Sequence, residues 1–255
     1  MSDTTAPVQA PAPKATAFPE PAFLKLIHKA EVMNTPKSIL IYGDAGRGKT
    51  WLAASISEVK EFGPVLLIDV EGGSSAIARD FKDVDVISID KHEQFQAVFD
   101  WLLGGEHKYK TVIIDTIGVV MDRAEKSFGE RPENKGNKFG KWGDLKNWAN
   151  DIFRAFHTAP FVSILIAHAL DDKDENSGAI KTTAMLPGSF KSTLPSIPDI
   201  VGYLSLEAQE DGPPQRVLVV GQSDRLVTKN RFGLPPKIYE PSMKKIIALI
   251  NNGGK

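Results

Sequence analysis

The chain has 255 residues, of which 42% are hydrophobic and 25% charged, as expected for a globular protein that can bury a sizeable core. Its 31 basic and 32 acidic residues nearly cancel, so any contact with nucleic acid must come from a local basic patch. The absence of cysteine excludes disulfides, thiolate zinc sites and cysteine nucleophiles.

The first residues are rich in Ala, Pro and Thr, which predicts a disordered arm over residues 1–17, followed by one domain over residues 18–252. This arm lacks the continuous apolar segment of a signal peptide. The longest apolar run, Phe161–Leu170, is much shorter than the roughly 20 residues that cross a bilayer. We therefore expect no membrane contact and a cytoplasmic location.

Short apolar runs alternate with longer segments of helical spacing along the rest of the chain. Runs that are apolar on both faces indicate parallel strands covered by helices, which predicts an α/β fold with a mostly parallel sheet. Three short β segments after residue 200 predict extra strands at one edge of that sheet. The expected strands are residues 38–42, 64–70, 84–90, 110–115 and 161–168. The expected helices are residues 50–61, 92–103, a segment from about 117, 145–156 and 241–250.

The stretch "SILIYGDAGRGKT" joins the first strand to the first helix through a glycine-rich turn. It matches the phosphate-binding pattern G-x-x-x-x-G-K-[ST] at every fixed position, in the strand–turn–helix context that the pattern needs. The backbone N–H groups of such a loop cradle phosphates, its Lys reaches the β and γ phosphates, and its Thr hydroxyl binds Mg²⁺. The residues of the predicted loop are Gly43, Asp44, Ala45, Gly46, Arg47, Gly48, Lys49 and Thr50.

Two further strand ends supply acids. Asp115 ends the apolar run "TVIID", where a carboxylate would hold the metal ion, and Asp69 in "LLIDVEGG" is the alternative. In many P-loop ATPases a Glu directly follows the metal-binding Asp, but Thr116 occupies that position here. Glu71, just past the second strand, is the candidate base that activates water, and a solvated loop Glu is the alternative interpretation.

These residues carry a resemblance to the RecA-like recombination ATPases. The P-loop, Glu71, "TVIID" and the "LIAH" that ends at His168 all resemble that group, and the narrowest match is "VTKNRFGLP" (Val227–Pro235). Lys-Asn-Arg-Phe-Gly resembles a signature of the RadA branch, and also small phage ATPases that act beside single-strand annealing proteins. The chain lacks the four-cysteine zinc finger of RadA and has no room for its protease-like domain. The phage-type, single-domain proteins are therefore the closer match.

The resemblance implies roles for three residues and an oligomeric state. Lys229 and Arg231 are expected to contact the γ-phosphate of ATP in a neighbouring subunit, as an arginine finger does. His168 is expected to sense the γ-phosphate and to relay its state to the loop that follows. The implied partners are single-stranded DNA and further copies of the chain in a ring or filament, with a single-strand-binding or annealing protein as a further candidate. A phage-encoded protein would act in the host cytoplasm.

Two polar segments are candidates for DNA contact. Residues 128–146 combine cations with aromatic side chains, which suits sequence-tolerant binding of single strands, and residues 170–183 are more acidic and suit a mobile lever. Solvated surface loops are the alternative for both. The predicted DNA-binding residues are Arg131, Lys135, Lys138, Phe139, Lys141 and Trp142.

The sequence therefore predicts an ATPase that uses ATP and Mg²⁺ and binds single-stranded DNA in recombination or annealing. Two alternatives stay open at this point. One is a P-loop kinase for a nucleotide or small molecule, and the other is a non-catalytic module whose assembly depends on bound nucleotide.

Overall fold

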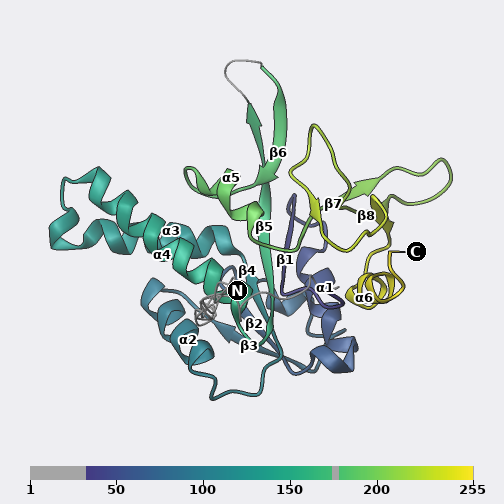
Figure 1. The fold of residues 1–255 in the computed structure, drawn as a ribbon, viewed down its shortest axis with the longest axis horizontal. Coiled ribbons are helices and arrows are strands. Elements are labelled where there is room, and N and C mark those ends of the chain that lie inside the picture. The colour runs from purple at the N-terminus through teal and green to yellow at the C-terminus, as the bar shows by residue number, and fades with distance from the viewer. Residues whose placement is uncertain (1–32, 174–177, 255) are drawn as a thin grey trace, which may run out of the picture. The chain divides into compact units, whose positions relative to one another are not determined.

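The computed structural model describes residues 33–173 and 178–254. Within these residues ten strands form a sheet in the order β10-β8-β7-β1-β5-β4-β2-β3, with β6 paired to β5 and β9 paired to β7 (Figure 1). The first six strands are β1 (Ser38–Gly43), β2 (Val65–Asp69), β3 (Val84–Ser88), β4 (Thr111–Asp115), β5 (Val162–Lys173) and β6 (Ile180–Ala184). The other four are β7 (Ile200–Glu207), β8 (Gln215–Val219), β9 (Lys229–Asn230) and β10 (Lys237–Tyr239).

Six neighbouring strands of this sheet, from β7 through β1, β5, β4 and β2 to β3, run parallel. At the β7 edge, β8 and β10 add antiparallel pairs. The expected fold class, an α/β fold with a mostly parallel central sheet flanked by helices and extra C-terminal strands at one edge, is confirmed. The sequence did not indicate that the first of these extra strands, β7, would lie directly beside β1.

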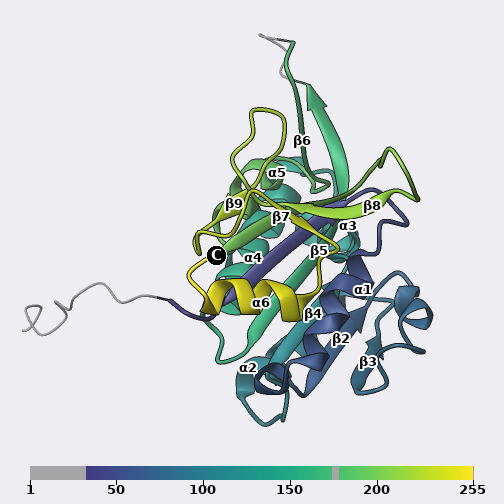
Figure 2. The ribbon, with the colours of Figure 1, turned by 90° about the vertical axis from the view of Figure 1, so that its right-hand side faces the viewer.

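Helices cover both faces of the sheet because its central strands are apolar on both sides. The helices are α1 (Lys49–Ala54), α2 (His92–Gly104), α3 (Ile117–Glu130), α4 (Lys138–Thr158), α5 (Phe190–Thr193) and α6 (Met243–Asn251). In β1, Leu40 and Tyr42 join the core under α2, α3 and α4, while Ile39 and Ile41 join the core under α1 and α6. Figure 2 shows α1 and α6 in front of the sheet. No helix of the described residues is long and apolar enough to cross a bilayer.

The helix expected over residues 50–61 is shorter than predicted. It ends at Ala54 and continues as two short 3₁₀ turns, at Ser55–Glu58 and Lys60–Phe62. The hydroxyl of Ser55 donates to the carbonyl of Leu52 at 2.7 Å, and a Ser side chain that bonds to the preceding turn competes with regular helix.

In the described residues, both polar segments that the sequence offered for DNA contact are largely regular structure, so the alternative of long solvated loops is corrected. Residues 128–146 include the end of α3 and the first turns of α4, which begins at Lys138 because the Asn137 side chain accepts a hydrogen bond from the Gly140 N–H at 3.0 Å. Residues 170–173 and 180–183 belong to the paired strands of the β5–β6 hairpin, which extends beyond the rest of the sheet (Figure 1). The predicted arm over residues 1–17, and the first residues of the predicted domain, lie outside the described residues.

Gly43, at the end of β1, is a position where only a hydrogen atom fits. A Cβ placed there would lie 2.3 Å from the backbone oxygen of Leu204 on β7. We expect Gly43→Ala to lower the free energy of unfolding by about 1–3 kcal/mol, because overpacking displaces backbone. Gly104→Ala, at an exposed helical position with nothing within 4 Å, is the matched control and should be neutral or slightly stabilising. Equal urea midpoints for the two variants would contradict this.

Candidate nucleotide site

The parallel register of the sheet brings the predicted site residues to one edge. Gly43 at the end of β1 lies opposite His168 on β5, and Asp69 at the end of β2 lies opposite Asp115 at the end of β4. The carboxyl ends of parallel strands are where open α/β sheets bind ligands. Residues separated by more than a hundred positions in the chain therefore meet beside the glycine-rich loop.

The glycine-rich loop turns through two residues in the left-handed region, Gly46 with φ of 74° and Gly48 with φ of 86°. Lys49, the first residue of α1, is 7% exposed, and its Nζ donates to the carbonyls of Gly43 at 2.9 Å and Asp44 at 2.8 Å. Burial lowers the pKa of Lys49, and the nearby Asp115 and Glu71 carboxylates act in the opposite direction. The ammonium group is therefore held inside the loop, next to two carboxylates.

Thr50 and Asp115 form the predicted metal-binding pair. The Thr50 hydroxyl donates to Asp115 Oδ2 at 2.6 Å, which joins α1 to the end of β4. Burial raises the pKa of Asp115, while the hydrogen bond from Thr50 opposes this effect. Mg²⁺ usually takes one or two protein oxygens together with substrate phosphates and water, so this hydroxyl–carboxylate pair fits the ion. The described residues contain no group of three or more Asp, Glu or His side chains arranged to hold a metal ion by themselves, and this mode of binding needs none.

Asp69, the alternative metal ligand, has a different task in this structure. Its Oδ1 accepts hydrogen bonds from the N–H groups of Glu71, Gly72 and Gly73, and its Oδ2 accepts one from Ser74 at 3.0 Å. Burial alone would raise the pKa of Asp69, but the hydrogen bonds from Ser74 and the turn amides outweigh it and hold the pKa below its usual value. Asp69 thus shapes the turn that carries Glu71.

Glu71 lies in a small polar cluster with two other side chains. The Thr116 hydroxyl donates to Glu71 Oε1 at 3.1 Å, and His168 Nε2 lies 3.1 and 3.2 Å from the two carboxylate oxygens. Thr116 follows Asp115 through a cis peptide bond. The structure therefore places Glu71 and His168, two residues predicted from the sequence, in direct contact.

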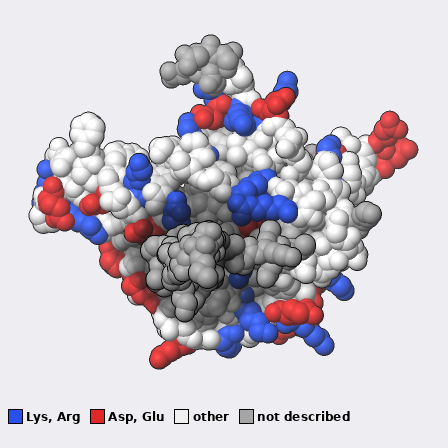
Figure 3. Space-filling model, in the orientation of Figure 1, with Lys and Arg blue, Asp and Glu red and all other residues white. Residues whose placement is uncertain are grey.

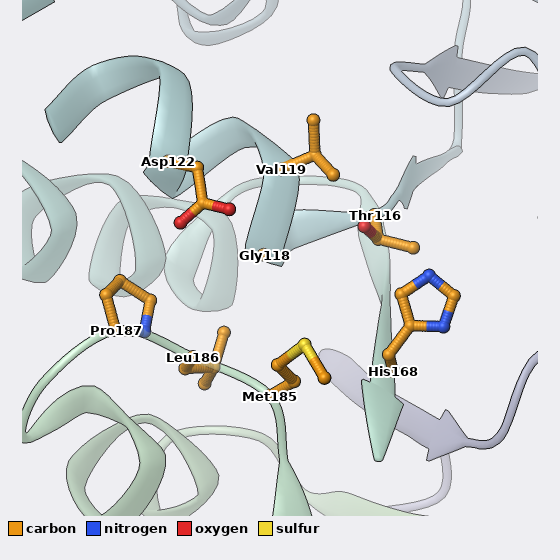
Figure 4. A pocket seen from close by; sticks show the side chains of 8 residues that line it. All are labelled: Thr116, Gly118, Val119, Asp122, His168, Met185, Leu186 and Pro187. Carbon is orange, nitrogen blue, oxygen red and sulfur yellow. The ribbon is translucent and has the colours of Figure 1, made fainter. Parts of the chain in front are cut away.

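A cavity of about 420 Å³ joins these groups into one site. Its polar walls come from Lys49, Thr50, Glu71, Asp115, Thr116 and His168. A second cavity of about 250 Å³ shares Thr116 and His168 with the first and is otherwise bounded by α3 and residues 185–187 (Figure 4).

Lys229 and Arg231 lie away from this cavity. Lys229 on β9 pairs with Val201 of β7, which in turn pairs with Leu40, so the two cations lie across β7 from the first half of β1 and not near its end. At roughly 3.3 Å per residue, Leu40 and Gly43 are about 10 Å apart along the strand. Lys229 Nζ donates to the carbonyl of Ser196 at 2.6 Å, and Arg231 forms a 2.8 Å ion pair with the fully buried Asp199. The structure therefore does not bring the predicted finger to the P-loop of its own chain.

The predicted DNA-binding residues lie around the junction of α3 and α4, but they differ in exposure and in the contacts that their side chains make. Arg131 packs over the Phe128 ring with its guanidinium carbon 4.2 Å from the centroid, and Lys141 forms a 2.7 Å ion pair with Glu125. Lys135 is exposed, and the side chain of Lys138 is not among those that the structure describes.

Two exposed aromatic residues begin α4. Phe139 is 91% exposed, and Trp142, which lies beside Gly188, is 38% exposed. On the face of the molecule in Figure 3, basic and acidic side chains are interspersed, which agrees with the balanced composition. The aromatic residues, rather than a dense basic patch, are thus what distinguish this region.

Sequence reasoning missed three residues that organise the site. In the sequence analysis Thr116 was noted only because it stands where many P-loop ATPases have a Glu. In the structure its hydroxyl donates a hydrogen bond to Glu71. Arg123 on α3 donates to the carbonyl of Val70 at 2.9 Å and so fixes the residue that links β2 to Glu71. Trp51, next to Thr50, lines the cavity. Of these three residues, only Trp51 could have been singled out from the sequence, because it is a large aromatic residue directly after the phosphate-binding motif.

Comparison with known proteins identifies the family. The profile of a family described as "AAA domain" matches residues 35–232, which is most of the chain. The chain belongs to this AAA domain family. A P-loop ATPase family of this kind implies nucleoside triphosphatase activity and, with it, a bound nucleotide. No curated protein matches this AAA domain protein in sequence.

Solved structures also match. One is the "Crystal structure of the RadB recombinase", which is 17% identical, with the match covering 74% of this chain and 83% of that chain at a TM-score of 0.47.

Proposed function

We propose that this AAA domain protein hydrolyses ATP with Mg²⁺ and couples hydrolysis to binding of single-stranded DNA in recombination or annealing. The observation that carries the ATPase part is the meeting of a complete P-loop, the Thr50–Asp115 pair and Glu71 in one cavity. These are a phosphate cradle, a metal site and a base, the parts that hydrolysis of a nucleoside triphosphate requires.

The geometry supports a role for each residue. Lys49, buried between the loop and two carboxylates, is placed to move from the carbonyls of Gly43 and Asp44 to the β and γ phosphates. Thr50 and Asp115 would hold the metal ion, which when bound neutralises charge on the phosphate oxygens. Glu71 accepts hydrogen bonds from Thr116 and His168 and keeps further acceptor sites for the attacking water.

His168 connects this site to the rest of the molecule. It lies on β5 where the strand leaves the sheet and continues into the β5–β6 hairpin, and it contacts both oxygens of Glu71. A change at the γ-phosphate that shifts Glu71 would therefore reach the hairpin through one strand. This supports the role of His168 as a sensor that the sequence resemblance implies.

DNA binding is proposed for the start of α4 and the turn before it. An aromatic side chain as exposed as Phe139 makes no contribution to the core, and the exposed Lys135 lies four residues before it. Aromatic faces for bases and a cation for the backbone are the elements of a sequence-tolerant single-strand site. Action beside an annealing protein, of the phage type, stays a prediction of the sequence resemblance.

The finger residues are proposed to act between subunits of a ring or filament. Lys229 and Arg231 lie across β7 from the first half of β1, whereas the P-loop follows its end, so they are badly placed for their own nucleotide. If a neighbouring copy packed its P-loop against the surface that carries Lys229 and Arg231, both cations would reach the nucleotide of that copy. The nucleotide would then lie between two subunits.

The first prediction from the proposed function concerns Glu71. We expect Glu71→Gln to retain ATP binding and to lose at least ~10²-fold in turnover, because the amide cannot accept the proton of the attacking water. Lys49→Ala is the contrasting variant and should lose ATP binding as well as hydrolysis. Equilibrium binding of ATP and single-turnover phosphate release separate the two. Unchanged turnover of Glu71→Gln would assign the base to another residue.

The second prediction concerns DNA. We expect Phe139→Ala to weaken binding of single-stranded DNA by about 1–3 kcal/mol, the usual contribution of a stacked base. Lys135→Ala should reduce the slope of log affinity against log salt by about 0.7, as for one lost phosphate contact. Leu103→Ala, at a 43% exposed position on α2, is the matched control. Equal affinities of Phe139→Ala and the control would remove this surface as the DNA site.

The third prediction tests the finger. Lys229→Ala subunits keep their own P-loop and Lys49→Ala subunits keep the finger, so a mixture should recover part of the hydrolysis that each variant lacks alone. Lys229→Ala is preferred to Arg231→Ala because Arg231 also neutralises the buried Asp199. A finger acting within its own chain predicts no recovery at any mixing ratio.

A further inference from the structure

One wall of the nucleotide cavity is formed by an aromatic residue that none of the proposed catalytic steps uses. Trp51 follows Thr50 on α1 and lines the cavity together with Ala76 and Ile77. The P-loop and the start of its helix cradle the phosphates of a nucleotide. A residue directly after Thr50 therefore lies within reach of the nucleoside, the ribose and base that carry those phosphates.

The Trp51 ring is fixed by three different contacts. The Arg216 guanidinium of β8 covers one face with its central carbon 4.5 Å from the ring centroid, and Phe81 meets the ring at a steep angle with centroids 5.4 Å apart. The indole Nε1 donates to Asp80 Oδ2 at 2.8 Å. Asp80 and Phe81 follow Ile77 closely in the chain, so the ring is held against the same segment that bounds the cavity.

Arg216 is itself held in place beside the phosphate loop. Its Nη2 lies 3.5 Å from Glu240 Oε2. The Glu240 N–H donates to the Arg216 carbonyl at 2.8 Å, and the Arg216 N–H donates to Glu240 Oε1 at 3.0 Å. A Cβ added at Gly48 would come within 3.3 Å of Arg216 Nη1. The stack of Arg216 on Trp51 therefore lies directly beside the P-loop.

We propose that Trp51 is the residue that binds the nucleobase of the substrate, and that it does so by stacking without reading the base edge. This inference rests on the proposed function, since it takes the cavity to be the nucleotide site. A ring already ordered by Arg216, Asp80 and Phe81 loses little freedom when a base stacks on it. Trp offers the largest aromatic surface for such a contact.

The absence of base-edge recognition follows from the side chains that line the cavity. Its polar side chains are those already assigned to phosphates, metal and water or to the support of Glu71, and the indole N–H of Trp51 is taken by Asp80. The remaining lining residues are Gly, Ala and Ile, which carry no side-chain donor or acceptor. ATP and GTP therefore bind with similar affinity.

The test compares three ligands of the full chain by titration calorimetry: ATP, GTP and inorganic tripolyphosphate, which has no base. We expect Trp51→Leu to weaken ATP and GTP alike, by roughly 5- to 100-fold for one lost stacking contact. Tripolyphosphate affinity should stay within about twofold, because the phosphate cradle is intact. Trp51→Phe should retain most of the ATP affinity, and Trp101→Leu, at an exposed position on α2, is the matched control.

Three results would overturn the proposal. Equal losses for ATP and tripolyphosphate in Trp51→Leu would mean that Trp51 supports the loop and not the base. Unchanged ATP affinity would place the base elsewhere, and more than tenfold discrimination between ATP and GTP by the unmodified protein would require contacts to the base edge. Failure of the unmodified protein to bind any of the three ligands would instead contradict the proposed function itself.

Discussion

The site depends on the parallel pairing of β1, β5, β4 and β2. This register sets Gly43 opposite His168 and Asp69 opposite Asp115, so that a phosphate loop, two acidic strand ends and His168 share one edge of the sheet. A slip of one residue in any of these strands would turn its buried side chains toward the wrong layer of helices. The apolar character of both faces of the sheet therefore fixes the position of the polar groups at its edge.

The three carboxylates at this edge, Asp69, Asp115 and Glu71, have different roles because their surroundings differ. Asp69 is saturated by turn amides, which leaves it a structural role and sets the path of the chain at Glu71. Asp115 is buried and bonded to Thr50, and Glu71 is half-exposed and bonded to Thr116 and His168. Three carboxylates close together in the fold thus differ in what they can bind, and only Asp115 and Glu71 face the cavity.

Much of this arrangement was predictable from the sequence, because it follows from strong local patterns. Apolar runs predicted the strands, and the complete motif from Gly43 to Thr50 predicted the loop and the helix after it. The length of α4 was not predictable from apolar spacing, because its first turns are polar and depend on the Asn137 cap and on the ion pair of Lys141 with Glu125. The roles of Thr116 and Arg123 depend on contacts between segments distant in the chain, and no local pattern indicates such contacts.

The most direct test of the account is phosphate release from ATP by the full chain, measured with and without single-stranded DNA. The account predicts Mg²⁺-dependent hydrolysis that rises when single-stranded DNA is added. Hydrolysis that does not respond to DNA, or phosphate transfer to a small acceptor instead of water, would contradict the coupling that we propose.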